Sequence, residues 1–304
     1  VAGTTRLRTR SAPARVAQRT QFGSTLDTFG GVQEKLAMMS VYQYATESMA
    51  YMVSGTMDSG HDEYQLEAAV SKIFSSEAAW FVTDEAIQIL GGMGYMRDSG
   101  LEKVMRDLRI FRIFEGTNDI LRLFIALTGM QYAGSHLKQL QGAVKNPFRN
   151  LNVLASEAGK RTKSRLGVYG NDVDVHQNLT NLADDLARDV TKFGRVVEAL
   201  LMKHQKDIIN QQFHLKRVAE IAIDLYVSVS VLSRCTKSLQ EGLESAHQEE
   251  LLARAWCHES HKRITENLDT LSSSSSSQDF QDMANISRAV CERVSVVQPN
   301  PLGF

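Results

Sequence analysis

The sequence is poor in proline and cysteine and has no excess of charge of either sign. Only four prolines occur in 304 residues, while Ala, Leu, Gln, Glu, Lys and Met are abundant, a composition that favours helix over strand. All three cysteines lie in the last third of the chain, at Cys235, Cys257 and Cys291. An odd number of cysteines without pair spacing excludes a disulfide framework, so we expect a reducing compartment.

The near-balance of charge excludes a protein built mainly to bind nucleic acid. The chain has 34 Lys and Arg against 35 Asp and Glu, a formal net charge of −1, whereas a chain built to bind nucleic acid is normally strongly basic. No apolar run reaches the roughly 18–20 residues of a membrane-spanning helix. The nearest, residues 221–232, is interrupted by Asp224, Ser228 and Ser230. We therefore expect a folded, helical chain that binds no nucleic acid.

The chain begins at Val1, without a methionine and without an apolar secretory segment. Residues 1–19 contain five arginines and no acid, which superficially suggests a transit peptide. We expect a fragment or a processed product.

Apolar residues recur at three- and four-residue steps through most of the chain, as helices require. This spacing predicts helices over residues 29–58, 62–90, 99–107, 117–132, 211–241, 246–271 and 279–296, and another through the leucines of 179–200. Val227–Leu232 taken alone could also form a strand. The six serines Ser272–Ser277 predict a flexible linker.

One segment departs from the balanced charge of the molecule. Residues 134–170 contain seven Lys and Arg and one acid, a local net charge of +6. Within it, residues 147–166 place apolar side chains on one face and Lys and Arg opposite, a pattern typical of a helix lying in a membrane surface, or of an ordinary solvated linker. We divide the chain into a helical domain at 1–133, a basic amphipathic linker at 134–170 and a second helical bundle at 171–304.

The glycines of residues 91–94 allow two interpretations. They follow a predicted helix and lack the spacing of a dinucleotide-binding loop, so a helix cap and turn explains them. Alternatively, their bare backbone N–H groups contact a phosphate-bearing ligand.

Glu115 also has two interpretations. It lies between Phe114 and Gly116 at the entry to a predicted helix, where an acid favourably interacts with the positive end of the helix. A carboxylate flanked by apolar groups also suits a general base near neutral pH. His258 and His261 lie beside Cys257 and Glu259, but they lack the spacing of a zinc motif, and we assign no metal site.

Three segments together carry a resemblance to a known family. Residues 19–23 (RTQFG), 88–95 (QILGGMGY) and 109–122 (RIFRIFEGTNDILR) resemble, in order and spacing, the C-terminal signatures of the acyl-CoA dehydrogenases. The second bundle and the ending at residues 300–304 (NPLGF) resemble the members that act on the longest acyl chains. The resemblance covers residues 16–304 and implies an all-α fold, the C-terminal four-helix bundle of that family followed by a second helical bundle.

The resemblance implies a role for each matching residue. Glu115 would be the catalytic base that removes the pro-R α-proton of a fatty acyl-CoA while the β-hydride passes to FAD, giving a trans-2-enoyl-CoA. Phe114 and Gly116 would lie against the substrate. The predicted FAD contacts are Thr117, Asn118 and Asp119, together with Arg19, Phe22, Gln88, Ile89, Leu90, Gly91 and Gly92, of which Arg19 and 88–92 would serve the flavin of a partner subunit.

The same resemblance implies partners and a location. These are a homodimer, a long-chain acyl-CoA, electron-transferring flavoprotein as electron acceptor, and peripheral attachment of the basic segment to the matrix side of the mitochondrial inner membrane. The N-terminal helical domain and middle β-domain of the family have no counterpart in these residues, so we expect the 304 residues alone to bind FAD poorly and to be inactive. The alternative function is a non-catalytic assembly factor for respiratory complex I, as known for a close relative.

Overall fold

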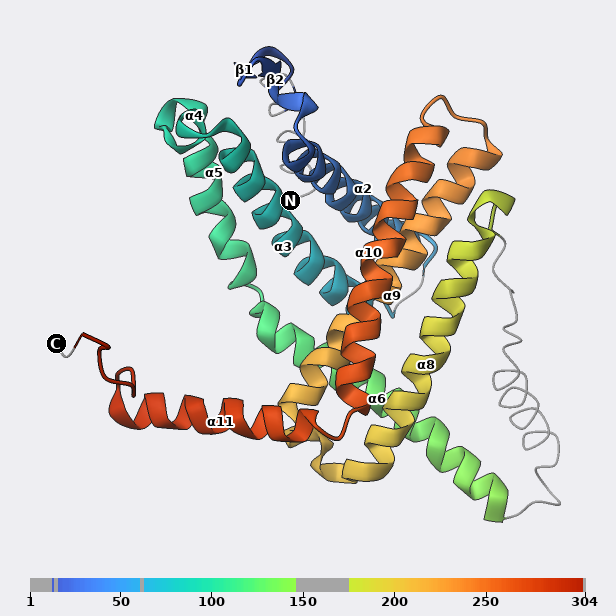
Figure 1. The fold of residues 1–304 in the computed structure, drawn as a ribbon. Helices are drawn as coiled ribbons and strands as arrows, with labels where there is room; N and C mark the ends of the chain where they lie inside the picture. Colours follow the sequence, from blue (N-terminus) through green and yellow to red (C-terminus); the bar gives the residue numbers. More distant parts are fainter. Residues whose placement is uncertain (1–12, 14–15, 61–62, 146–174, 303–304) are drawn as a thin grey trace.

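The computed structural model describes residues 13, 16–60, 63–145 and 175–302, with the backbone alone described for 136–145. Within these residues the chain is almost entirely helical, and the only sheet is a two-stranded hairpin (Figure 1). The all-α prediction is confirmed. Residues 147–166, for which we predicted a membrane-surface helix, lie outside the described part of the chain.

Long helices form the body of the molecule. They are α2 (Gly30–Asp58), α3 (Gln65–Leu90), α6 (Asn118–Lys145), α8 (Thr180–His204), α9 (Gln212–Gln240), α10 (Ala246–Ser272) and α11 (Ser276–Arg293). Shorter elements connect them: β1 (Thr20–Gln21), β2 (Ser24–Thr25), α4 (Gly92–Tyr95), α5 (Leu101–Leu108) and the 3-10 turns η1 (Leu26–Thr28), η2 (Arg97–Ser99), η3 (Arg109–Arg112), η5 (Gln177–Leu179) and η6 (Gln205–Asn210). No described helix has the length and apolar character needed to cross a bilayer.

The predicted helices are present, with three differences. The helix predicted over 117–132 extends to Lys145 as α6, so the segment from 134 to 145 of the predicted linker is helical. Val227–Leu232 forms part of α9 and no strand. The prediction of a six-serine linker is wrong in extent, because α10 includes Ser272 and α11 begins at Ser276, which is itself buried.

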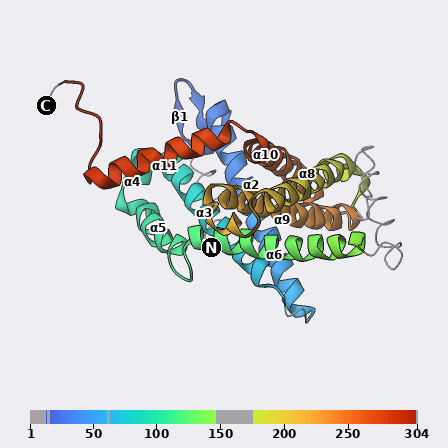
Figure 2. The same cartoon turned by 90° about the horizontal axis from the view of Figure 1, so that it is seen from below.

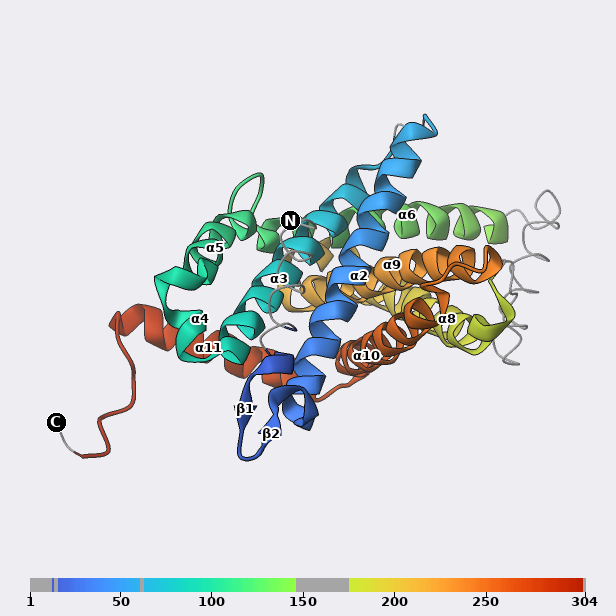
Figure 3. The ribbon, with the colours of Figure 1, turned by 90° about the horizontal axis from the view of Figure 1, so that it is seen from above.

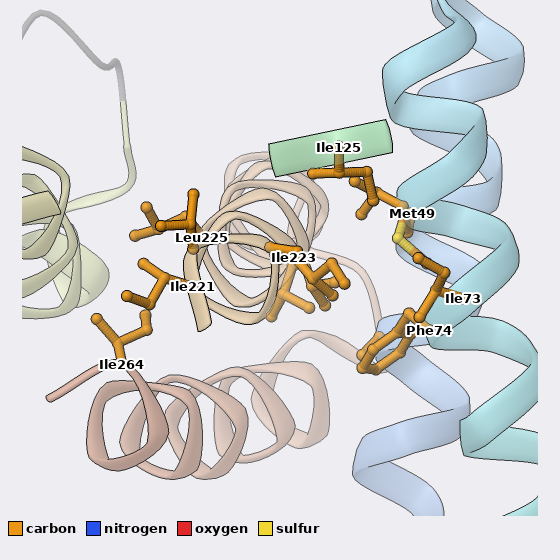
Figure 4. Close-up of a cluster of buried hydrophobic side chains, with 14 of the residues drawn as sticks. Met49, Ile73, Phe74, Ile125, Ile221, Ile223, Leu225 and Ile264 are labelled. Carbon is orange, nitrogen blue, oxygen red and sulfur yellow. The ribbon is translucent and has the colours of Figure 1, made fainter. Parts of the chain in front are cut away.

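The main hydrophobic core is shared between the first helical region (α2–α6) and the second helical region (α8–α10). Helix α9 packs against α10, α6 and α2, and lies between α6 and α10 in the views from below and above (Figures 2 and 3). Met49 and Ile73 of the first region and Ile221 and Ile264 of the second belong to one continuous cluster (Figure 4). Burial of this shared surface holds the two regions together.

Trp256 of α10 shows how closely the two regions join. Its side chain is fully buried, and its ring lies 5.2 Å from the ring of Phe74 in α3 and 6.0 Å from that of Tyr42 in α2, both at edge-to-face angles. Its indole N–H donates to the hydroxyl of Ser228 in α9 at 3.0 Å. One side chain of the second region therefore contacts both α2 and α3 of the first.

A smaller cluster forms the other end of the first region. Val16, Met39, Val82, Ile89 and Leu101 are buried there together with Ala86. This cluster supports the β1–β2 hairpin, which projects beyond the first turn of α2 (Figure 3). At the hairpin tip Phe22 and Gly23 have φ of 51° and 82°. Positive φ at both central residues is the signature of a type I′ turn, whose twist matches that of the paired strands.

Candidate active site

Glu115 lies in the short connection between η3 and α6. Its φ is +53°, in the left-handed region that non-glycine residues rarely adopt, and that of Gly116 is +86°. Both residues are exposed. The apolar enclosure that the sequence suggested for this carboxylate is therefore not formed by the described residues, although Phe114 and Phe111 stack edge-to-face beside it with ring centroids 5.1 Å apart.

The connection is tied to helix α3 by Lys72. Its ammonium group donates to the carbonyl oxygen of Gly116 at 2.8 Å and to Oδ1 of Asn118 at 2.8 Å. Burial lowers the pKa of Lys72, and the negative charges of Glu115 and Glu77 oppose that effect. The lysine thus bridges the residue after Glu115 and the first residue of α6.

Asn118 is buried and its side chain is committed to protein partners. Besides accepting from Lys72, its amide donates to Ser76 Oγ at 2.9 Å and to Glu77 Oε1 at 3.0 Å. We predicted Asn118 as a cofactor contact, and the described geometry leaves its side chain no free donor for one. The adjacent Thr117 caps α6, accepting from the N–H of Ile120 at 3.3 Å. Asp119 is exposed at the positive end of the helix.

A series of ion pairs links the partners of Asn118 to the second helical region. Arg122 donates to Glu77 Oε2 at 2.8 Å and to Oε1 of Glu220, in α9, at 2.7 Å. Burial tends to raise the pKa of Glu77, but the hydrogen bond and charge of Arg122 outweigh burial and hold the pKa below its ordinary value. The pKa of Arg122 is in turn raised by its two acidic partners despite burial.

A pocket of about 390 Å³ opens beside Glu115. Its wall is largely apolar, from Ala50 and Val53 of α2, Ala68 of α3, Phe111 of η3 and Phe114 of the connection. Ser71, Lys72, Ser75 and Ser76 supply the polar part of the lining. The sequence prediction that Phe114 and Gly116 flank the substrate stays a prediction, but Phe114 does line a cavity next to the proposed base.

The glycines at the end of α3 cap the helix and also leave the backbone uncovered by side chains. Gly91 has φ of +61° and its N–H donates to the carbonyls of Ile87 and Gln88 at 3.1 Å each. A Cβ atom added at Gly91 would lie 3.7 Å from the guanidinium of Arg19. Arg19 and Gly92 also line one cavity of about 710 Å³. The cap interpretation of these glycines is therefore correct, and a cation lies beside the bare backbone.

The remaining predicted cofactor residues are distributed around this end of the molecule. Phe22, at the hairpin tip, is 95% exposed, and Gln88 is exposed on α3. Ile89 is buried in the smaller core cluster and Leu90 packs against that cluster. A ligand could therefore reach Ile89 only through its backbone, while Phe22 and Gln88 offer their side chains.

The structure separates the predicted site residues into two groups. The Glu115 group contacts α3 at Lys72, and the Arg19 group contacts it at Gly91. Nineteen residues of helix, at 1.5 Å each, place the two contacts about 28 Å apart. One group therefore lies at each end of the first helical region.

Sequence reasoning missed Lys72, Glu77, Arg122 and Glu220. The available signal was the occurrence of Lys72, Ser76 and Glu77 on a largely buried helix, because ionisable groups at such positions need partners. Their partners come from α6 and α9, and sequence periodicity does not identify pairs so far apart. The other polar group that the sequence singled out, His261, pairs with the buried Asp189 at 2.7 Å across α8 and α10.

Comparisons with known proteins place this geometry in a family. The family description "Acyl-CoA dehydrogenase, C-terminal domain" matches residues 2–129, and "ACAD9/ACADV, C-terminal domain" matches residues 177–296. The mitochondrial very long-chain specific acyl-CoA dehydrogenase of Bos taurus is 54% identical over 95% of this chain and 45% of its own length. The human protein of the same name is 51% identical over 100% of this chain and 47% of its own.

A solved structure supports the match at the level of the fold. The acyl-CoA dehydrogenase from Bacillus anthracis, crystallised with FAD, superposes with a TM-score of 0.72 at 26% identity. The superposition covers 89% of this chain and 47% of that one. The chain thus spans about half the length of the relatives it matches. With family descriptions matching both helical regions and sequence identity of about half along the whole chain, the protein belongs to the acyl-CoA dehydrogenase family.

Proposed function

We propose that this chain supplies the catalytic base and part of the flavin site of an FAD-dependent enzyme that oxidises long-chain fatty acyl-CoA thioesters to trans-2-enoyl-CoA, the first step of mitochondrial fatty acid β-oxidation. The observation that carries the proposal is the placement of Glu115. It lines a largely apolar pocket, on a connection that Lys72 and Asn118 fix to α3. A single positioned carboxylate is the group that removal of an α-proton requires.

The residues of this chain divide the work as follows. The carboxylate of Glu115 takes the α-proton of the thioester and becomes neutral. Phe111 and Phe114 keep the acyl carbons next to the base in an apolar setting. The absence of a side chain at Gly116 lets the connection lie close to Leu121, because a Cβ atom at Gly116 would lie only 3.3 Å from the Leu121 side chain. FAD, when bound, accepts the hydride from the β-carbon, so that proton and hydride together account for the two hydrogens lost.

The residues at the far end of α3 fit the diphosphate of a flavin dinucleotide. Arg19 provides a guanidinium, which pairs well with phosphate, beside the side-chain-free backbone of Gly91 and Gly92. The exposed aromatic ring of Phe22 lies at the tip of the β1–β2 hairpin, which begins directly after Arg19. The described residues therefore offer charge, close backbone approach and a stacking surface, which are the features such a cofactor needs.

The separation of the two groups supports a homodimer. Arg19 and Gly91 lie about 28 Å along α3 from the Lys72 contact that holds the Glu115 connection. A dimer in which the Arg19 end of one subunit serves the flavin near Glu115 of the other would use both groups.

The names of the relatives bear on the cellular location of the proposed enzyme. The curated relatives named above are mitochondrial and specific for very long acyl chains. These names support a location in mitochondria. We propose further that the protein lies peripherally on the matrix side of the inner membrane through the basic segment 134–170, and that electron-transferring flavoprotein is its electron acceptor. The dehydrogenase function is preferred over a role in complex I assembly, because the relatives that match the whole chain are named as dehydrogenases and Glu115 provides the carboxylate that proton removal requires.

The test replaces Glu115 by Gln in the full-length protein. The change keeps size and hydrogen bonding but removes the base, so we expect turnover of long-chain acyl-CoA to fall by at least about a thousandfold while FAD content and melting temperature stay as in the parent. Glu266→Gln, an exposed acid on α10, is the matched control and should leave turnover unchanged. Unchanged turnover in Glu115→Gln would refute the assignment of the base.

A further inference from the structure

The backbone at Glu115 needs to be held in place from outside. A left-handed conformation is sterically unfavourable for a residue with a side chain, so an exposed connection would leave it unless other contacts opposed the change. Glu115 has φ of +53° and is exposed. The restraint must therefore come from neighbouring residues that contact the connection on either side of Glu115.

Lys72 supplies that restraint at the peptide between Gly116 and Thr117. Its ammonium group lies 2.8 Å from the Gly116 carbonyl oxygen and 2.8 Å from Asn118 Oδ1. The two acceptors come from the connection and from the start of α6, and the donor comes from α3. Lys72 consequently fixes the direction of the peptide between Gly116 and Thr117, and so restrains the backbone from which the Glu115 side chain leaves.

The restraint continues through buried groups into the second helical region. Asn118 is oriented by Ser76 and Glu77, and Glu77 is bonded to Arg122. Arg122 is only 8% exposed and also bonds Glu220 of α9. Every member of the series is held by the next, so the position of α9 affects the orientation of Asn118 and the acceptor that it offers to Lys72.

From these contacts we infer that Lys72 is a positioning residue for the base Glu115, and that the series Asn118–Glu77–Arg122–Glu220 links its placement to the second helical region. The inference rests on the proposed function, since it assigns what holds the proposed base. It assigns no contact with substrate to Lys72. Positioning of this kind matters because a displacement of about 1 Å at a catalytic group can cost a hundredfold in rate.

The experiment isolates removal of the α-proton from flavin reduction. The probe is a long-chain acyl-CoA with oxygen in place of its β-carbon, which has no β-hydrogen to transfer. The flavin-loaded full-length protein is incubated with the probe in D2O, and deuterium entering the α-position is measured by mass spectrometry. Affinity for the probe is measured separately by titration, and folding by melting temperature and FAD content.

We expect Lys72→Met to slow deuterium exchange about ten- to hundredfold at saturating probe while its affinity changes less than about threefold. Lys72→Arg, which keeps a cation able to reach two acceptors, should recover most of the rate. Glu220→Gln should slow exchange by a smaller factor, because it only loosens Arg122. Lys262→Met, which removes an exposed lysine paired with Glu259, is the control and should not change it.

The outcomes separate this inference from the proposed function. Exchange that persists in Glu115→Gln would overturn the base assignment itself. Exchange abolished by Glu115→Gln but equal in Lys72→Met and Lys262→Met would overturn only the role of Lys72. If Lys72→Met fails to bind FAD or to fold, Glu220→Gln decides the matter, since it is remote from the connection: normal exchange in that variant would refute the link to α9.

Discussion

At Gly94 a single hydrogen atom in place of a side chain allows α4 to fold back onto the end of α3. A Cβ atom built there would lie 2.3 Å from the carbonyl oxygen of Ile87 and 2.8 Å from its Cα. Both are backbone atoms of α3 and cannot rotate away. Of the glycines in residues 91–94, Gly94 is required for packing, whereas Gly91 and Gly92 leave backbone open beside Arg19.

Gly94→Ala should therefore destabilise the protein by about 1–3 kcal/mol, the usual cost of forcing extra volume into a packed site. The matched control is Gly129→Ala in α6, where a Cβ meets nothing within 4 Å. That change should stabilise the protein by about 1 kcal/mol, because alanine is the better helix former. Urea denaturation with an unchanged m-value measures both. Equal stability of the two variants would contradict the steric argument.

At the scale of elements, α11 is the helix least supported by the rest of the molecule. It leaves α10 and runs away from the second helical region (Figure 1). Its main anchor is Phe280, whose ring stacks on Phe213 at 5.0 Å and meets His214 edge-to-face at 5.2 Å. The guanidinium of Arg217 lies 4.5 Å from the centre of the same ring. A few aromatic contacts thus dock the helix on the start of α9.

The same junction contains a pair of histidines. The rings of His204 and His214 lie 5.2 Å apart, and one nitrogen of each is buried without a hydrogen-bond partner among the described residues. Burial lowers the pKa of both; the nearby Lys203 adds to the effect for each, and Asp207 opposes it at His204. For His214, the charges of His204 and Arg217 act in the same direction as burial.

This lowering predicts a loss of stability in acid. In the unfolded chain these histidines take up protons near the ordinary histidine pKa of about 6.5, whereas in the folded chain they do so only at lower pH. Their contribution to the free energy of unfolding is therefore fully present above about pH 6.5 and is lost as the pH falls through the lowered pKa values of the folded state. As the pH is lowered from 7.5 to 5.5, amide hydrogen exchange in α11 and at the start of α9 should become faster, once the measured rates are corrected for the pH dependence of exchange in an unfolded chain. His204→Gln/His214→Gln should abolish the acceleration. An unchanged pH response in that double variant would show that other groups cause it.

At the scale of the whole molecule, the sequence suggests separate helical domains, but the two helical regions share one continuous hydrophobic core. Trp256 of the second helical region lies against Phe74 and Tyr42 of the first. The buried Glu249 of α10 also accepts from the hydroxyl of Tyr44 in α2 at 2.8 Å. Contacts of this kind couple the two regions, because neither region can lose its packing without exposing the surface of the other.

We therefore expect both regions to unfold in one transition. The two tryptophans provide the test, since Trp80 lies in α3 and Trp256 in α10. In Trp80→Phe the fluorescence of Trp256 reports on the second region, and in Trp256→Phe that of Trp80 reports on the first. In each variant the fluorescence midpoint in urea should coincide with that of far-ultraviolet circular dichroism. Separate midpoints would mean that 1–133 and 171–304 fold as independent domains.

The sequence by itself determined the helices, because an apolar side chain at every third or fourth position is a local property that marks the buried face of a helix. It also singled out Glu115, Arg19 and Gly91, through segments whose order and spacing resemble one family. Boundaries were less well determined: α6 continues through Gly134, which does not end the helix, as far as Lys145, and the first proline after Tyr132 comes only at position 147.

Only the tertiary structure decided which residues contact the connection around Glu115 and how the helical regions join. Lys72, Arg122 and Glu220 come from three different helices, and Arg122 and Glu220 are 98 positions apart in the sequence. No local pattern predicts such a pair. The requirement that buried charges find partners applies only once packing has removed them from water, and that packing belongs to the folded molecule as a whole.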